Sequence, residues 1–289
     1  AMLLANRGNR TVNNELAYHS QGITGRFAYY YNQKYLMEFN FGYNGTERLG
    51  KGDRFEFFPA VSLGWLVSNE KFFEPLSDVV SSLKLRGSYG LVGSDETGPS
   101  NAPHFLYIDQ VQVTGNGRPG FTTGENLNVS YYGPVVQQWA VQNGGWERVK
   151  KLDVGFDMEL FRELSITFDF FYDKRYNILL HREAWPQSLG FHEAKPWSNK
   201  GKVDNWGYEV STNWRKQFTK DLTVDFRGTF TYTQNKYIDV DEPIYPYVWQ
   251  TATGKPLNRR NGYIAEGLFQ SQEEIDNSPT QNLGSKPMP

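Results

Sequence analysis

The sequence predicts an all-β fold: an antiparallel transmembrane β-barrel, present in part as roughly ten strands of a larger barrel. Three observations support this fold class. Apolar and polar residues alternate with a period of two in many segments. Short turns and long loops alternate between those segments. Aromatic residues are abundant, with 20 Phe, 18 Tyr and 8 Trp in 289 residues, which favours strands over helices.

The alternation is clearest in residues 35–43. One face carries Tyr35, Met37, Phe39, Phe41 and Tyr43, and the other carries Leu36, Glu38, Asn40 and Gly42. The same pattern recurs in residues 83–91, 152–160, 164–172, 207–214 and 222–232. Successive side chains of a strand point to opposite faces, so each segment has one apolar face. These faces extend over about nine to eleven residues, the length that a tilted strand needs to cross a bilayer.

The connections fall into two groups. Short turns are expected at residues 32–34, 161–163 and 216–221. Long loops are expected at residues 44–54, 93–103, 180–202 and from 239 onward. The connection over residues 68–82 is longer than the other short ones, and a helix is expected at 70–81, with a second at 272–277. Residues 98–134 are rich in Gly, Pro and Asn and predict a loop region with short strands, one of them over 104–113.

The composition argues against several classes of function. The chain has no Cys, which excludes disulfides, thiol catalysis and Cys-based metal sites, and its net charge of -2 gives no reason to expect a nucleic-acid partner. Residues 115–120 match G-x-G-x-x-G, but Pro119 interrupts the helix that a dinucleotide site needs, so we expect no cofactor. The four His residues have no metal-ligand spacing, so we expect no metal site.

Charged residues occupy the polar faces, where the alternation predicts that they line a hydrated lumen. They are Glu38, Lys84, Arg86, Asp153, Asp157, Glu159, Asp169, Glu209, Asp225 and Arg227. An alternative is a β-rich glycoside hydrolase, in which two of these carboxylates would flank a sugar. The lumen interpretation needs no such geometry, and we expect the chain not to be an enzyme.

A second set of candidates is aromatic and lies outside the alternating segments, where an exposed ring can stack on a sugar or pack on a partner protein. These substrate or partner contacts are Trp139, Trp146, Trp185, Trp197, Tyr245, Tyr247 and Trp249. For each ring the alternative is packing between loops or anchoring at the membrane interface, because large aromatic side chains are usually well covered.

Six segments, in this order, resemble the SusC/RagA family of TonB-dependent outer-membrane transporters. They are residues 25–45, which end in Phe41-Gly42-Tyr43-Asn44-Gly45; 54–73, with Phe57-Phe58-Pro59-Ala60; 83–90; Trp146-Glu147-Arg148 leading to Phe171-Tyr172-Asp173-Lys174-Arg175; 199–209; and 266–271. The resemblance covers nearly the whole chain.

The resemblance implies nutrient import across the bacterial outer membrane by a barrel of about 22 strands with an N-terminal plug. It also implies energy supplied through TonB, a SusD-like surface lipoprotein as partner, and an oligosaccharide or peptide as substrate. We expect all of residues 1–289 to belong to the barrel, with the plug domain and the C-terminal strands absent. The alternative is a soluble all-β glycan-binding module, which predicts shorter strands, turns of similar length at both ends and solubility without detergent.

Overall fold

The computed structural model describes residues 1–11, 17–96, 105, 107–113, 119–141, 144–186, 195–262, 264–265, 267–279, 281–282 and 287–288. The chain forms two compact units, Ala1–Leu257 and Asn258–Pro289. The first unit contains the large sheet and both sets of candidate residues. The second contains the helix α1 (Gln272–Asn277), at the place where the sequence predicts it, and the strands β14 (Gln281–Asn282) and β15 (Pro287–Met288). No helix in the described part of the chain is long and apolar enough to cross a membrane.

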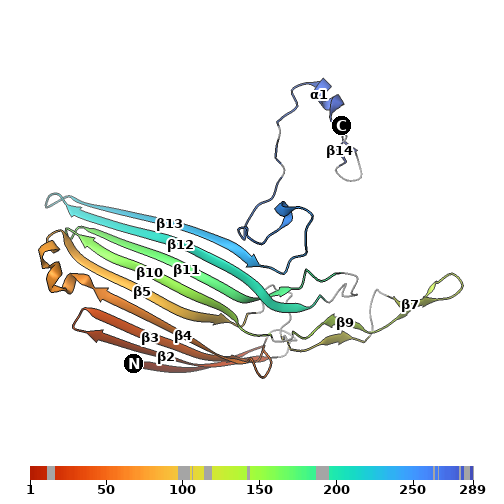
Figure 1. Ribbon diagram of the computed structural model, residues 1–289, viewed down its shortest axis with the longest axis horizontal. Helices are drawn as coiled ribbons and strands as arrows, with labels where there is room; N and C mark the ends of the chain where they lie inside the picture. The colour runs from red at the N-terminus through yellow and green to blue at the C-terminus, as the bar shows by residue number, and fades with distance from the viewer. Residues whose placement is uncertain are drawn as a thin grey trace. The chain divides into compact units, whose positions relative to one another are not determined.

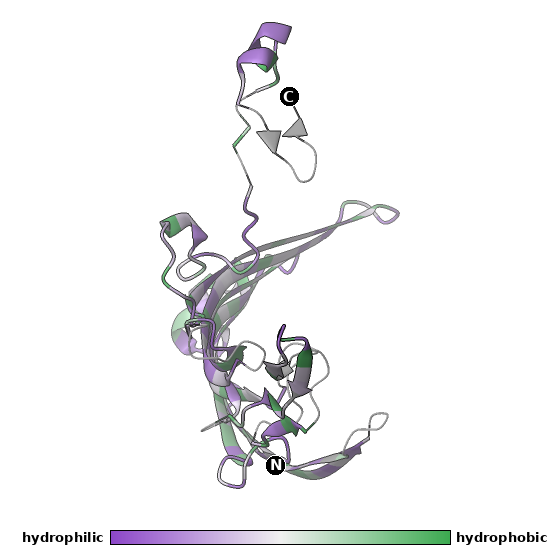
Figure 2. Cartoon of the chain, turned by 90° about the vertical axis from the view of Figure 1, so that its right-hand side faces the viewer, coloured by the Kyte–Doolittle hydropathy of each residue, from purple (hydrophilic) through white to green (hydrophobic). Residues whose placement is uncertain are grey.

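Nine antiparallel strands form the main sheet, in the order β1-β2-β3-β4-β5-β10-β11-β12-β13. They are β1 (Met2–Arg10), β2 (Tyr18–Tyr31), β3 (Tyr35–Thr46), β4 (Phe55–Leu66), β5 (Val80–Ser94), β10 (Glu147–Leu160), β11 (Leu164–His181), β12 (Trp197–Gln217) and β13 (Thr223–Asp239). These strands lie side by side (Figure 1), and β1 and β13 are the two open edges. From the side, the sheet is a curved wall (Figure 2), as expected for part of a barrel.

Four short strands lie between β5 and β10. β6 (Gln110–Gln112) pairs with β9 (Val135–Gln138), and β7 (Pro119–Thr123) pairs with β8 (Val129–Tyr132). Short strands were predicted in this region. Within the stretch 104–113, where one strand was expected, β6 has only three residues. His104 lies outside the described residues.

The register aligns most apolar residues of the nine strands on one side of the sheet, here called the apolar face. For example, Phe39 is opposite Phe27 and Val61, and Val61 is opposite Tyr89. Directly opposed residues in antiparallel strands point the same way, so the period-two pattern is continuous across the sheet. Large side chains that are at least 40% exposed on this face include Ile23, Phe27, Tyr43, Phe57, Leu63, Leu85, Tyr89, Val154, Phe226 and Phe230. An apolar patch of this extent suits lipid rather than water.

The two ends of the sheet differ as predicted. Residues 32–34, 161–163 and 218–222 make tight turns at one end, here called the short-turn end. At the opposite, long-loop end, residues 47–54, 95–146 and 182–196 connect the strands. This alternation of short and long connections is the pattern of outer-membrane barrels.

Three predicted boundaries are wrong in detail. Residues 70–81 do not form an α-helix: a 3₁₀ helix, η2 (Lys71–Leu76), follows η1 (Val67–Asn69), since Pro75 lacks the N–H that an α-helical turn needs. The loop expected over 180–202 is shorter, because β11 and β12 remain paired as far as His181 and Trp197. The main strands have 9 to 21 residues, many longer than a membrane crossing requires, because neighbouring strands continue to satisfy each other's backbone groups at the long-loop end.

Glu70 fixes the connection at the short-turn end. Its carboxylate accepts hydrogen bonds from Lys34 Nζ (2.8 Å), the Tyr35 hydroxyl (2.8 Å) and Trp65 Nε1 (3.3 Å). The hydrogen bond from Lys34, followed by that from Tyr35, lowers the pKa of Glu70. Rings of Tyr and Trp with their polar groups in such contacts are typical of a membrane interface.

Candidate functional site

A charge cluster lies on the polar face of the sheet, the side opposite the apolar face. The guanidinium of Arg86 lies 2.6 Å from Asp169, 3.4 Å from Asp157 and 3.5 Å from Asp153. Lys84 Nζ is 3.9 Å from Asp157. One cation from β5 thus holds three carboxylates from β10 and β11.

Gly155 makes this cluster possible. It is directly opposite both Arg86 and Asp169, so it lies between the two charged partners. A Cβ at this position would be 2.3 Å from the carbonyl oxygen of Phe168 and 2.4 Å from Asp169 Oδ1. A larger residue would therefore push apart the groups that meet across it.

The register puts the other predicted lumen residues on the same face. Glu38 pairs with Arg26 and accepts a hydrogen bond of 2.7 Å from Asn40. Glu209 is opposite Asp169 on β11, and Asp225 is 3.7 Å from Arg215. Glu159 and Arg227 complete the set, opposite Ser165 and Asn213. All ten residues therefore share one side of the sheet.

The predicted aromatic contacts separate into two groups, and the first is buried. Trp146 and Trp197 are only 6% and 8% exposed. Both belong to a hydrophobic cluster at the long-loop end, which also contains Leu49, Phe58, Val141 and Leu179. The Trp146 ring meets Phe58 edge-on at 5.3 Å, and its Nε1 donates to the Arg54 carbonyl at 3.3 Å. This placement agrees with packing, the alternative given above for these two rings.

The second group is more exposed. Tyr247 and Trp249 stack at 4.4 Å with an interplanar angle of 11°, and Trp249 is 67% exposed. They lie at the 3₁₀ helix η4 (Val248–Gln250), beyond the end of β13, and Tyr245 precedes them. Trp139 is 38% exposed, and Trp185 lies under the guanidinium of Arg182 at 5.4 Å.

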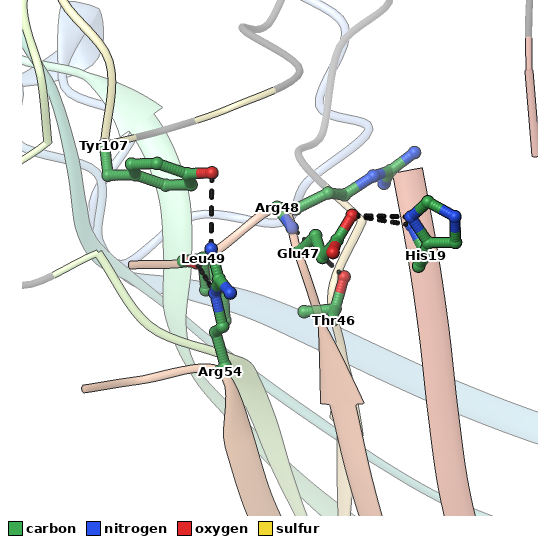
Figure 3. A network of polar contacts seen from close by, with 7 residues as sticks. All are labelled: His19, Thr46, Glu47, Arg48, Leu49, Arg54 and Tyr107. Atoms are coloured by element: carbon green, nitrogen blue, oxygen red, sulfur yellow. Dashed lines mark hydrogen bonds and ion pairs between the residues drawn. The ribbon is translucent and has the colours of Figure 1, made fainter. Parts of the chain in front are cut away.

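Figure 3 shows a polar network at the long-loop end, which the sequence did not predict. Glu47 lies 2.8 Å from His19 Nδ1 and accepts the His19 backbone N–H at 3.2 Å. The hydrogen bond from His19 lowers the pKa of Glu47. Arg54 donates to the Leu49 carbonyl at 3.1 Å and to the Tyr107 hydroxyl at 3.5 Å. No motif marks these residues, because strand pairing brings His19 to Glu47 from 28 positions away.

The fold and the two-sided sheet define a class, the antiparallel barrels of the bacterial outer membrane. Residues 25–268 match the family model for the TonB dependent receptor-like β-barrel, so the chain belongs to this family.

Named relatives agree with this assignment. The chain is 28% identical to the TonB-dependent receptor P39 of Formosa agariphila over 270 residues, which cover 92% of this chain and 24% of the relative. It is 27% identical to the TonB-dependent receptor SusC of Bacteroides thetaiotaomicron, over 90% of this chain and 26% of SusC. The chain thus spans about a quarter of the length of these relatives.

Solved structures support the fold. The structure of the RagAB peptide transporter superimposes with a TM-score of 0.64 at 20% identity, over 83% of this chain and 25% of that chain. Together with the match to SusC, this confirms the SusC/RagA resemblance and the partial-barrel fold predicted from the sequence. None of these findings supports the soluble alternative.

Proposed function

We propose that this chain forms part of the wall and the extracellular loops of an outer-membrane transporter that imports nutrients with energy from TonB. One observation carries the proposal: the apolar face is continuous across nine strands, and charged residues occupy the opposite face. The apolar face meets lipid and the polar face lines the conduit. The conduit supplies many weak contacts, so that substrate both enters and leaves.

The substrate in this proposal is an oligosaccharide or a peptide. The flat, exposed pair Tyr247 and Trp249 supports this choice, because a ring face can pack on the C–H side of a sugar or on an apolar side chain. Together with Tyr245, Trp139 and Trp185, this pair is the proposed surface for substrate or for a SusD-like lipoprotein. Trp146 and Trp197 we assign to packing, since their neighbours cover them.

The proposal also assigns roles to the parts of the whole protein. Residues 1–289 contribute barrel and loops, and other parts of the longer protein supply the plug, the contact with TonB and the remaining strands. No residue here is assigned a catalytic role. The carboxylates of Asp153, Asp157 and Asp169 share one guanidinium, which suits a fixed lining better than an acid and base pair.

Deletion and complementation in the source bacterium test the function. Deleting the full-length gene should abolish uptake of one labelled oligosaccharide or peptide, and dissipating the proton gradient should do the same. Trp249→Ala should reduce uptake, and Trp249→Tyr, which keeps a flat ring, should restore most of it. Uptake that survives both the deletion and the loss of the proton gradient contradicts the proposal, as does recovery of the protein in the aqueous fraction without detergent.

A further inference from the structure

A pocket of ≈230 Å³ lies at the long-loop end of β1, β2 and β3. Its base is one transverse row of the sheet, in which Arg7, Gln21, Gly45 and Phe55 are successive register partners. A Cβ on Gly45 would be 2.4 Å from the Phe55 ring, so only glycine lets this ring lie over the row. The pocket therefore depends on a specific arrangement of side chains.

The row belongs to the apolar face and not to the polar face. Two positions further into the sheet, the same face carries the row of Ile23, Tyr43 and Phe57, each at least 45% exposed. Phe55 itself stacks on Tyr43 at 5.4 Å. Two residues along a strand are about 7 Å, so the base of the pocket lies about 7 Å along the strands from this apolar row, toward the long-loop end.

The lining of the pocket has an excess of positive charge. Arg7 and Arg54 contribute two guanidinium groups, and His19 adds an imidazole. The one carboxylate is that of Glu47, and a single oxygen of it contacts both the backbone N–H and Nδ1 of His19. The two guanidinium groups face one carboxylate that already contacts His19, so an anionic group gains from binding here.

We propose that this pocket binds the phosphorylated headgroup of a lipid in the outer leaflet, with the acyl chains of that lipid lying on the apolar face below it. The long-loop end is extracellular in barrels of this kind, which places the pocket at the outer leaflet. Basic pockets at the edge of a membrane-spanning surface recognise anionic headgroups in the same way. The inference rests on the outer-membrane placement proposed above.

A lipid is favoured over a soluble phosphate because the pocket is continuous with the apolar row. A soluble anion would use the guanidinium groups alone, whereas the acyl chains of a lipid would also pack on Ile23, Tyr43 and Phe57. The two sources therefore differ in how much their binding depends on an attached acyl chain.

The test uses the full-length protein, extracted from outer membranes, stripped of lipid and held in detergent micelles. Three probes are titrated: lipid A with both phosphates, the same lipid after dephosphorylation, and inorganic phosphate. The variants are Arg7→Gln, which removes a positive charge, and Gln21→Glu, which adds a negative one, so each lowers the net charge of the pocket by one unit. Arg10→Gln, on the same strand but on the other face, and Gln21→Met are the matched controls.

Phosphorylated lipid A should bind, and each of Arg7→Gln and Gln21→Glu should weaken it by about fivefold, the effect of one basic charge near a membrane surface. The controls should bind like the unmodified protein. Equal binding of the dephosphorylated lipid, equal binding of inorganic phosphate, or variants that bind like the controls would each overturn the proposal. A protein that needs detergent and imports substrate but fails this test refutes the lipid site alone, whereas failure of the uptake experiment refutes the proposed function.

Discussion

Two neighbouring positions on β11 give a direct prediction about the two faces. Phe168 lies on the apolar face, opposite Phe156 and Val210, and Thr167 lies on the polar face, opposite Asp157 and Ser211. Phe168 is four residues from the start of β11, about 13 Å along the strand, which is close to the middle of the apolar belt. The same substitution, to Arg, can therefore be made on each face at one depth.

The expected costs follow from these surroundings. An Arg at mid-depth on a lipid-facing barrel position costs about 2 to 4 kcal/mol. Phe168→Arg also removes ring contacts with Phe156 at 5.5 Å and Tyr208 at 6.5 Å. Each such contact contributes about 0.5 to 1.5 kcal/mol, so the total loss is about 3 to 7 kcal/mol. Thr167→Arg, which places a cation beside the carboxylate of Asp157, should change stability by no more than about 0.5 kcal/mol.

The assay is guanidinium unfolding of the full-length protein from lipid vesicles, with free energies compared among the wild type and the two variants. Equal losses for Phe168→Arg and Thr167→Arg would refute the reasoning, because the two faces would then have the same surroundings. A loss below 1 kcal/mol for Phe168→Arg would also refute it, since lipid could not then be the solvent of that face.

Three further predictions concern the charge cluster, the short-turn end and the loop aromatics. Arg86→Gln should lower the free energy of unfolding by about 1 to 2 kcal/mol at low salt and less at 0.5 M salt, because three carboxylates lose their shared cation; Asp169→Asn in the same chain should recover part of this loss. Glu70 has a lowered pKa when folded, so the stability lost in Glu70→Gln should be largest above pH 4.5 and vanish as the pH falls through that pKa, as unfolding at a series of pH values can show. Trp146→Ala should cost about 3 to 5 kcal/mol, and Trp249→Ala should stay within about 0.5 kcal/mol while uptake falls; similar costs for both would contradict their assigned roles.

The parts of the fold that depend on local pattern could be predicted from the sequence. Strands such as β3 and β10 follow from alternation alone, since one slip of register would turn every apolar side chain to the other face. Ser271 marks the start of the helix α1 in the sequence. Its side chain caps the helix by accepting the Glu274 N–H at 3.2 Å. The direction of the ten charged residues followed from the same alternation.

The features that the sequence did not predict depend on partners far apart in the chain. Arg86 meets Asp169 from 83 positions away, and only the register of three strands brings these residues together. For Trp146 the sequence left contact and packing as alternatives, because its neighbour Phe58 belongs to a distant strand. The His19–Glu47 network arises in the same way, so the sequence could give the face of a residue but not its partners.

The central claim is that the sheet separates lipid from water, with even and odd positions of β11 in different solvents. The chain has no cysteine, so single cysteines can be placed one by one at positions 165 to 170 of the full-length protein, after removal of any cysteine elsewhere, and spin-labelled in vesicles. Collision with oxygen, which dissolves in lipid, should peak at 166, 168 and 170, and collision with a water-soluble nickel chelate should peak at 165, 167 and 169. Labels that show no period of two, or the opposite phase, would contradict the claim.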